Sequence, residues 1–228
     1  MTAQDIRLKT PLDESDARNL RIGDFVYLDG QIHTGRALVY QHVLEKGVAP
    51  PIDIAGTCNV QMHGAPAGVE DAPGRYRVSS IQATASFRYW KWVGPYIERF
   101  GIRAIIGKGG MEQSIYEDVF ARCGAVFLTT VGYGIAAKYG RGVVGVEAVY
   151  WQDELGLPEA MWVLNVENFG PFIVEGDCTG ASLAAQSVET VNEKFRDAYE
   201  KLPQHILKRI GEIDDKLDHE VITDKNVR

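Results

Sequence analysis

The hydrophobic and polar positions in the first third of the chain are arranged mostly as in strands. Residues 24–30 (Asp-Phe-Val-Tyr-Leu-Asp-Gly) read as an alternating, half-buried strand. Residues 36–47 carry apolar side chains at helical spacing and end in glycine, which is typical of a helix terminus. Residues 48–80 are rich in proline and glycine, so they predict a loop-rich stretch with short strands near 54–62 and 77–81.

From residue 83 onward the periodicity changes to helices that alternate with short apolar strands. The sequence predicts helices at 83–100, 113–123 and 133–139. It predicts strands at 103–107 and 125–131 and, further along, near 143–151, 161–166 and 172–174. A β-rich first third followed by strand–helix alternation predicts an α/β fold in which helices pack on a mixed sheet.

The two ends of the chain differ from this central region. Residues 1–19 are polar and predict a loose N-terminal arm, and residues 20–185 form the predicted main domain. Residues 186–228 predict a helical C-terminal extension, because apolar side chains recur every three or four residues from Val188 to Leu202. Pro203 breaks or kinks this helix, and an apolar stripe continues as far as Leu217. The extension either packs on its own domain or forms a hairpin that contacts another subunit.

Composition and charge exclude several classes of protein. The 228 residues include 24 Lys and Arg against 31 Asp and Glu, a net charge of 24 − 31 = −7. An acidic chain repels phosphate backbones, so we expect no nucleic-acid partner. No apolar stretch approaches the roughly 18 residues that span a bilayer, and residues 1–20 show no apolar signal-peptide core, so we expect no membrane association.

The cysteines and histidines supply no recognisable metal motif. Cys58, Cys123 and Cys178 are odd in number and widely spaced, which argues against a disulfide framework and against zinc. We therefore expect structural thiols in a cytoplasmic, reduced protein. The histidines are isolated in the sequence, and His63 is the one that can reach a site loop.

Two glycine motifs are candidates for nucleotide binding. Gly101 and Gly107 precede Lys108 with five residues between them and no Ser or Thr after it, which excludes a phosphate-binding loop. Residues 132–137 (Gly-Tyr-Gly-Ile-Ala-Ala) follow a strand and open a helix, the order of a dinucleotide site. The same pattern also describes a tight turn, so a dinucleotide-binding oxidoreductase domain stays an alternative.

A scattered set of cationic and hydroxyl side chains is the better candidate site. Arg36 follows a strand, Lys108 stands between glycines after another strand, and Thr84 and Arg88 are predicted on one face at the start of a helix. Arginine holds carboxylates through paired hydrogen bonds, and lysine supplies a point charge. Together these residues predict a site for a small dicarboxylate.

Several segments resemble the β subunit, or C-terminal half, of the iron–sulfur hydro-lyases of the class I fumarase and tartrate dehydratase family. Residues 20–36 (Leu-Arg-Ile-Gly-Asp-Phe-Val-Tyr-Leu-Asp-Gly-Gln-Ile-His-Thr-Gly-Arg) are similar to the family's opening strand, and residues 105–109 (Ile-Ile-Gly-Lys-Gly) to its IGKG motif. Shorter similarities lie at 123–128, 153–160 and 177–180. The resemblance covers roughly residues 20–182.

The resemblance implies a fold, a reaction and a partner. It implies a swivelling β/β/α domain, and a subunit that takes part in reversible dehydration of a small hydroxy-carboxylic or dicarboxylic acid such as malate or tartrate. It implies a 4Fe–4S cluster held by three cysteines of an α subunit and not by this chain, in an α2β2 assembly. It also implies that Arg36, Arg88 and Lys108 bind the substrate and that Thr84 is the catalytic base.

The segment at 82–90 departs from the motif that it resembles. The family's pattern is GPTT, a small residue and GRMD, whereas this chain keeps Thr84 and Arg88 but has Tyr89-Trp90 in place of Met-Asp. Ala37 and Tyr40 stand where the family has Asp and His. A non-catalytic carboxylate-binding or regulatory homologue is therefore the second hypothesis, and the sequence leaves the hydroxy-acid unnamed.

Overall fold

The computed structural model describes residues 3–132 and 134–201, and the chain divides into two compact units, Met1–Leu183 and Ala184–Arg228. The strands are β1 (Asp5–Lys9), β2 (Phe25–Thr34), β3 (Val60–Met62), β4 (Gly64–Ala72), β5 (Arg75–Ala83), β6 (Ala104–Gly107), β7 (Val126–Thr130), β8 (Val143–Tyr150) and β9 (Met161–Gly176). The helices are α1 (Glu14–Asn19), α2 (Ala37–Tyr40), α3 (Ile54–Thr57), α4 (Trp90–Phe100), α5 (Gln113–Ile115), α6 (Ala121–Cys123), α7 (Ala136–Arg141), α8 (Gln152–Leu155) and α9 (Leu183–Lys201). Short π-helical turns at Gln41–Glu45 and Tyr116–Phe120 and a 3₁₀ turn at Phe87–Tyr89 extend α2, α5 and α4.

The main unit is built on a mixed sheet with the strand order β1-β2-β3-β6-β7-β9-β8. Neighbouring pairs from β1 to β7 are parallel, whereas β9 is antiparallel to β2, β7 and β8. Because β9 pairs with both β2 and β7, the sheet closes into a ring. These features confirm the α/β class and the mixed sheet.

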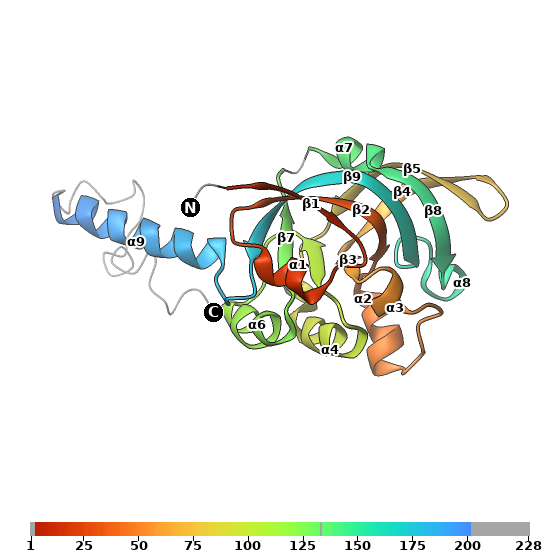
Figure 1. Cartoon of the computed structure of the whole chain (residues 1–228), viewed down its shortest axis with the longest axis horizontal. Coiled ribbons are helices and arrows are strands. Elements are labelled where there is room, and N and C mark those ends of the chain that lie inside the picture. The colour runs from red at the N-terminus through yellow and green to blue at the C-terminus, as the bar shows by residue number, and fades with distance from the viewer. Residues whose placement is uncertain (1–2, 133, 202–228) are drawn as a thin grey trace, which may run out of the picture. The chain divides into compact units, whose positions relative to one another are not determined.

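The two faces of the sheet bury two separate hydrophobic cores. On β6, Ala104 and Ile106 belong to the core inside the ring, whereas Ile105 belongs to the core under the helices. This alternation is what a strand buried on both faces requires, because successive side chains point to opposite faces. Figure 1 shows α4 and α6 on one side of the sheet and α7 on the other.

The expectation of a loose N-terminal arm is wrong for residues 5–19. Strand β1 pairs in parallel with β2, from Asp5 opposite Phe25 to Lys9 opposite Asp29. Polarity alone suggested an arm, but an edge strand can alternate exposed and half-buried residues and still pair.

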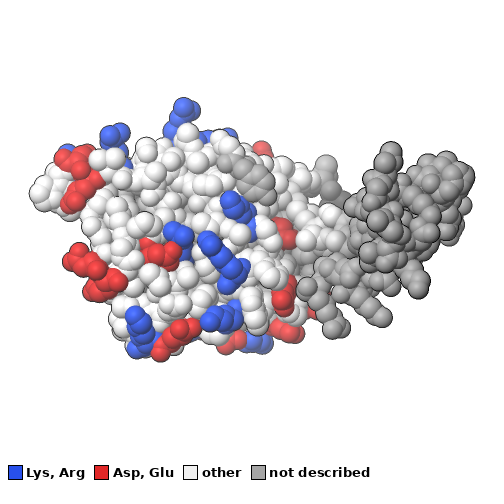
Figure 2. All heavy atoms as spheres, turned by 180° about the vertical axis from the view of Figure 1, so that it is seen from behind, with Lys and Arg blue, Asp and Glu red and all other residues white. Residues whose placement is uncertain are grey.

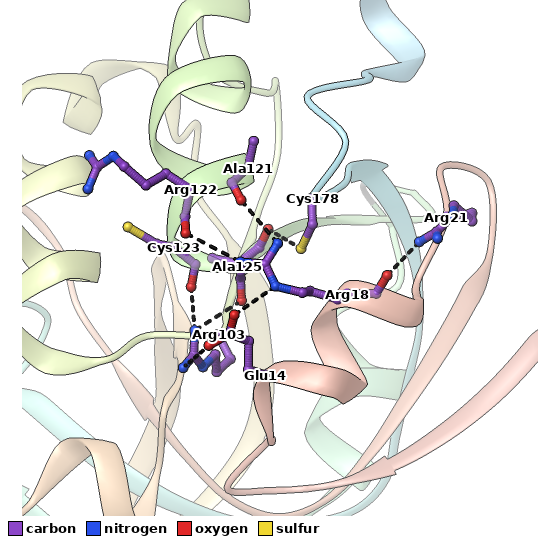
Figure 3. Close-up of polar contacts among 10 residues, drawn as sticks. Glu14, Arg18, Arg21, Arg103, Ala121, Arg122, Cys123, Ala125 and Cys178 are labelled. Carbon is purple, nitrogen blue, oxygen red and sulfur yellow. Dashed lines mark hydrogen bonds and ion pairs between the residues drawn. The ribbon is translucent and has the colours of Figure 1, made fainter.

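Helix α1, in the same N-terminal segment, is held by a set of charged contacts (Figure 3). The Arg18 guanidinium donates to the carbonyls of Ala121 and Arg122 at 3.2 and 3.3 Å, at the end of α6. Glu14 bridges Arg18 at 2.7 Å and Arg103 at 3.1 Å. Cations at a helix C-terminus satisfy carbonyls that have no partner within the helix.

The loop-rich prediction for 48–80 is confirmed for residues 48–53 and for the short strand at 77–81, which lies within β5, but it is wrong for the rest of 64–80. Residues 64–83 form an antiparallel hairpin, β4–β5, whose strands pair from Gly64 opposite Ala83 to Ala72 opposite Arg75. Pro66 and Gly68 lie within this separate two-stranded sheet, and Pro73 and Gly74 form its turn. The turn at Gly74 has a positive φ of 71°, a conformation that favours glycine.

On the face shown in Figure 2, Lys and Arg side chains are interspersed with Asp and Glu side chains. Within residues 3–132 and 134–201, no helix is long and apolar enough to cross a membrane. Helix α9 confirms the predicted helix at 186–202 up to Lys201, and the predicted break at Pro203 and the stripe to Leu217 lie outside the described residues.

Candidate functional site at the strand ends

The candidate residues follow three neighbouring parallel strands that end at the same edge of the sheet. Arg36 comes after β2, His63 directly after β3 and Lys108 directly after β6. The His63 N–H donates to the Ile106 carbonyl at 2.8 Å, which continues the ladder past the strand end. Adjacent strands lie about 4.8 Å apart, so the chain leaves β2 and β6 roughly 10 Å apart. The carboxyl edge of such a sheet is the usual ligand position in α/β folds.

Residues 84–86 run across the ends of β3 and β6 and bring Thr84 into this edge. The Thr84 N–H donates to the His63 carbonyl at 2.6 Å, and the Ser86 N–H donates to the Lys108 carbonyl at 2.9 Å. Ala85 and Lys108 form an isolated parallel bridge. The structure thus joins the segment 84–86 to Lys108 through Ala85 and Ser86, although a helix and a strand separate them in the sequence.

The predicted helix start at residue 83 is wrong, and with it the shared helical face of Thr84 and Arg88. Strand β5 ends at Ala83, Ala85 forms an isolated bridge, the 3₁₀ turn begins at Phe87 and α4 begins at Trp90. The physical reason is that the N–H groups of Thr84 and Ser86 bond to strand-end carbonyls instead of to a helical turn.

Arg88 and Lys108 are exposed to different degrees. Arg88 is exposed, and its guanidinium carbon lies 5.0 Å from the centroid of the Tyr89 ring, a cation–π contact. Lys108 is half-buried beside Gly109 and Gly110, both of which have positive φ values. The Met111 N–H donates to the Tyr116 hydroxyl at 2.8 Å, which ties the far end of this glycine loop to the core.

Arg36 already has protein partners in the structure. Its Nη1 donates to the Pro158 carbonyl at 3.0 Å, and its Nη2 forms an ion pair with Glu159 at 3.1 Å. The Arg36 Nε is buried and has no hydrogen-bond partner. A substrate carboxylate at Arg36 therefore has to compete with Glu159 for the guanidinium.

A buried polar network behind Thr84 was missed by sequence reasoning. Tyr40 donates to Gln61 Oε1 at 2.6 Å, and its oxygen also lies 2.6 Å from His63 Nε2. His63 Nδ1 lies 2.8 Å from Ser86 Oγ. Since Tyr40 gives its one proton to Gln61, His63 Nε2–H donates to Tyr40 and Nδ1 accepts from Ser86. His63 and Tyr40, which stands where the related motif has histidine, were the sequence signals, but Gln61 and Ser86 carried none.

His63 is held neutral in this network. Burial lowers the pKa of His63 to about 3, and the charge of Arg88 adds to the effect. Its ring therefore joins the site as a hydrogen-bonding group and carries no charge near neutral pH. Its main-chain carbonyl accepts from both the N–H and the hydroxyl of Thr84, at 2.6 and 3.2 Å. His63 thus fixes the 84–86 segment through its backbone and through its ring.

The cysteines do not form a cluster site in the part of the chain that the structure describes. All three are free thiols, and no group of three His, Cys, Asp or Glu residues there is placed to hold a metal ion. Burial raises the pKa of Cys58 to about 12 and that of Cys178 to about 11, so both favour the thiol over the thiolate that binds iron.

The glycine motif at 132–137 lies in the turn between β7 and α7. The predicted order of strand, turn and helix is confirmed, and the Gly132 carbonyl accepts from Gln82 Nε2 at 3.1 Å. Helix α7 spans only six residues, and neither Gly132 nor Gly134 has a positive φ. These observations favour the tight turn over the dinucleotide site.

Comparisons with known proteins agree on one family. Residues 1–187 match the family model described as "Fumarase C-terminus". The chain is 36% identical over 198 residues, 86% of its length, to the "Putative L(+)-tartrate dehydratase subunit beta" of Methanocaldococcus jannaschii, and covers 95% of that protein. It is 30% identical over 201 residues, 87% of its length, to the "L(+)-tartrate dehydratase subunit beta" of Escherichia coli K12, covering 96% of it. It is 35% identical over 190 residues, 83% of its length, to the "Putative fumarate hydratase class I" of Geobacillus stearothermophilus, of whose length it spans 35%.

Proposed function

Because this chain belongs to the fumarase C-terminus family, we propose that it is the β subunit of a hydro-lyase that reversibly dehydrates a small hydroxy-dicarboxylic acid, malate-like or tartrate-like. The observation that carries the proposal is the strand-end edge, where the segment that follows Thr84 is joined to Lys108 through Ala85 and Ser86 and leads into Arg88. Two cations and a hydroxyl suit an acid substrate with a proton to be removed next to a carboxylate.

Each residue of the edge has a part in this reaction. Arg88 and Lys108 bind the carboxylates and orient the acid, and Arg36 contributes a third cation. Thr84, as the alkoxide, takes the proton from the carbon next to a carboxylate. The electron pair of that C–H bond forms the double bond as the hydroxyl leaves the neighbouring carbon with its bonding electrons. The proton held by Thr84 then passes to the departed hydroxide, which releases water and restores the alkoxide. Positive charge nearby favours the alkoxide, which a threonine in water does not form at neutral pH.

The proposal includes a partner subunit that holds the 4Fe–4S cluster, in an α2β2 assembly. When bound by that subunit, the cluster supplies a Lewis-acid iron for the leaving hydroxyl. The high thiol pKa values of Cys58 and Cys178 support ligands from outside this chain. The three free cysteines also suit a cytoplasmic location, where thiols stay reduced.

Apolar side chains around the edge support a covering partner. Phe87 and Trp90, on either side of Arg88, are both 47% exposed, and Val131, directly after β7, is 38% exposed. Large apolar side chains that flank a cationic site are typical of a surface that another subunit covers.

The test is reconstitution of the chain with a cluster-bearing partner, followed by assay on L-malate, fumarate and L-tartrate. We expect an iron–sulfur absorption band and turnover in the complex, and neither in the chain alone. Arg88→Ala should raise KM about 10- to 100-fold through loss of a charge-assisted hydrogen bond. Lys91→Ala removes an exposed cation three residues away that pairs with Glu45, and should leave KM within twofold.

Two outcomes contradict the proposal in different ways. Turnover and an iron–sulfur band in the chain alone would refute the split between two subunits. A complex that binds these acids without turnover would support the non-catalytic homologue.

Glu159→Gln probes the role of Arg36 separately. Loss of the competing carboxylate should lower KM about threefold if Arg36 binds substrate, and should leave KM unchanged if Arg36 only supports the fold.

A further inference from the structure

Tyr89 lies behind the candidate site and touches two of its residues. Its side chain is only 1% exposed, and its hydroxyl lies 3.3 Å from Thr84 Oγ1. The Arg88 guanidinium sits 5.0 Å from its ring centroid, and the His63 ring packs edge-on to it at 4.9 Å. One buried side chain therefore connects the candidate base with a candidate carboxylate ligand.

The direction of the Tyr89–Thr84 hydrogen bond follows from the other contact of Thr84. The Thr84 hydroxyl donates its proton to the His63 carbonyl at 3.2 Å, and a carbonyl can only accept. With the Thr84 proton committed in this way, the donor between the two hydroxyls is Tyr89. Thr84 Oγ1 thus accepts a hydrogen bond from a buried phenol while its own proton is donated to the carbonyl.

We infer that Tyr89 is a positioning residue for the proton step, donating to Thr84 Oγ1 and stabilising that oxygen while it carries negative charge. The inference rests on the proposed function, in which Thr84 takes the substrate proton. Once Thr84 has lost its own proton, the His63 carbonyl repels it, and Tyr89 remains as its donor. Hydrogen bonds to a charged oxygen are stronger than those between neutral groups, and burial strengthens them further.

The hydrogen bond from Tyr89 to Thr84 depends on a position at which this chain departs from the related motif. In the motif that residues 82–90 resemble, methionine stands in the place of Tyr89. A thioether has no proton to donate, so it can fill the space without supporting an alkoxide. The cation–π contact with Arg88 adds positive charge over the ring and favours donation by the phenol.

The first arm of the test is kinetics of the assembled enzyme with Tyr89→Phe, which keeps the ring and removes the hydroxyl. We expect kcat, and exchange of the substrate's α-proton with solvent, to fall about 10- to 100-fold while KM stays within threefold. Tyr96→Phe is the matched control, because Tyr96 is equally buried and its hydroxyl bonds to His33 Nε2 at 3.1 Å, away from Thr84. It should leave kcat within twofold.

The second arm needs no turnover. The urea midpoints of Thr84→Val, Tyr89→Phe and the double variant of the chain report whether the two hydroxyls interact. We expect the shift of the double variant to be smaller than the sum of the single shifts. Additive shifts, or a Tyr89→Phe enzyme with wild-type kcat, would overturn the inference and leave the proposed function standing. A wild-type complex without turnover would overturn the proposed function and, with it, the role of Tyr89 in a proton step, whatever the midpoints show.

Discussion

The proposed function makes the Thr84 hydroxyl the catalytic base, a role that the chemistry of threonine alone does not suggest. A threonine in water is a poor base, and here its proton points to the His63 carbonyl. It lies between strand β5 and the 3₁₀ turn that contains Arg88, and the next residue, Ala85, bridges to Lys108. Those cations, and not an intrinsic property of threonine, make a base role reasonable.

Removing the Thr84 hydroxyl tests this assignment at the scale of one atom. We expect Thr84→Val to lower kcat of the reconstituted enzyme by about 100-fold or more, with KM within a few-fold, because the proton acceptor is lost and the cations remain. Thr84→Ser keeps the hydroxyl and should retain kcat within about tenfold. Near-wild-type exchange of the substrate's α-proton in Thr84→Val would remove Thr84 from the base role. The group that accepts the proton would then be His63 or a residue of the partner subunit.

At the scale of elements, helix α1 depends on contacts made far away in the sequence. Arg18 pairs with Glu14 and donates to the last carbonyls of α6, so it links two elements (Figure 3). We expect Arg18→Ala to lower Tm by about 2–5 °C and to speed proteolysis near residue 20. Thermal unfolding and limited proteolysis measure the two effects.

The hairpin β4–β5 offers the matched control for this helix. Arg75 and Asp71 form an ion pair of the same spacing and the same 2.7 Å length as Arg18 and Glu14, but both partners belong to this one hairpin. Arg75→Ala should therefore change Tm by about 1 °C or less, as exposed ion pairs usually do. Equal shifts in the two variants would mean that the α6 carbonyls add nothing to the stability of α1.

The end of strand β6 requires glycine for a steric reason. A Cβ at Gly107 would lie 1.8 Å from Ser86 Oγ and 2.8 Å from Phe127 Cζ. Gly107→Ala should therefore lower the free energy of unfolding by about 1–3 kcal/mol, the range for overpacking, and displace the 84–86 segment. Urea unfolding gives the measurement. Adding Ser86→Gly should recover part of the loss, whereas Gly134→Ala, at a position with open space, should be nearly neutral.

At the scale of the whole molecule, two buried neutral histidines make stability depend on pH. Burial lowers the pKa of His33 to about 4 and that of His63 to about 3, from the usual 6.5. Below pH 6.5 the unfolded chain therefore binds protons that the folded chain does not. The contribution of these two histidines to the free energy of unfolding is therefore greatest above pH 6.5 and is lost as the pH falls toward 4.

Urea unfolding at pH 7 and pH 5 measures this loss. We expect each histidine to contribute on the order of 2 kcal/mol to the decrease over that interval. His33→Gln or His63→Gln should remove about half of the pH-dependent part, and the double variant should remove most of it. An unchanged pH dependence in the double variant would assign the effect to other groups.

Much of the fold follows from the sequence alone. Buried strands such as 104–107 and 126–130 are continuous apolar runs, and the helices at 90–100 and 183–201 repeat their apolar side chains at helical spacing. These periods depend on local geometry, so they are readable without knowing any neighbour. Arg36, Thr84, Arg88 and Lys108 were also identifiable from the sequence, since the motifs that they belong to are short and contiguous.

Only the tertiary structure decided what those residues contact. Strand β1 exists because its edge pairs with β2, and Thr84 lies outside the helix because its N–H finds the His63 carbonyl and not a helical turn. Tyr40 and Tyr89 were visible in the sequence only as departures from the related motif, and the structure shows that they make hydrogen bonds to His63 and Thr84. Local periodicity records which face of an element is buried, whereas the partner of a buried polar atom is set by chain segments that are distant in sequence.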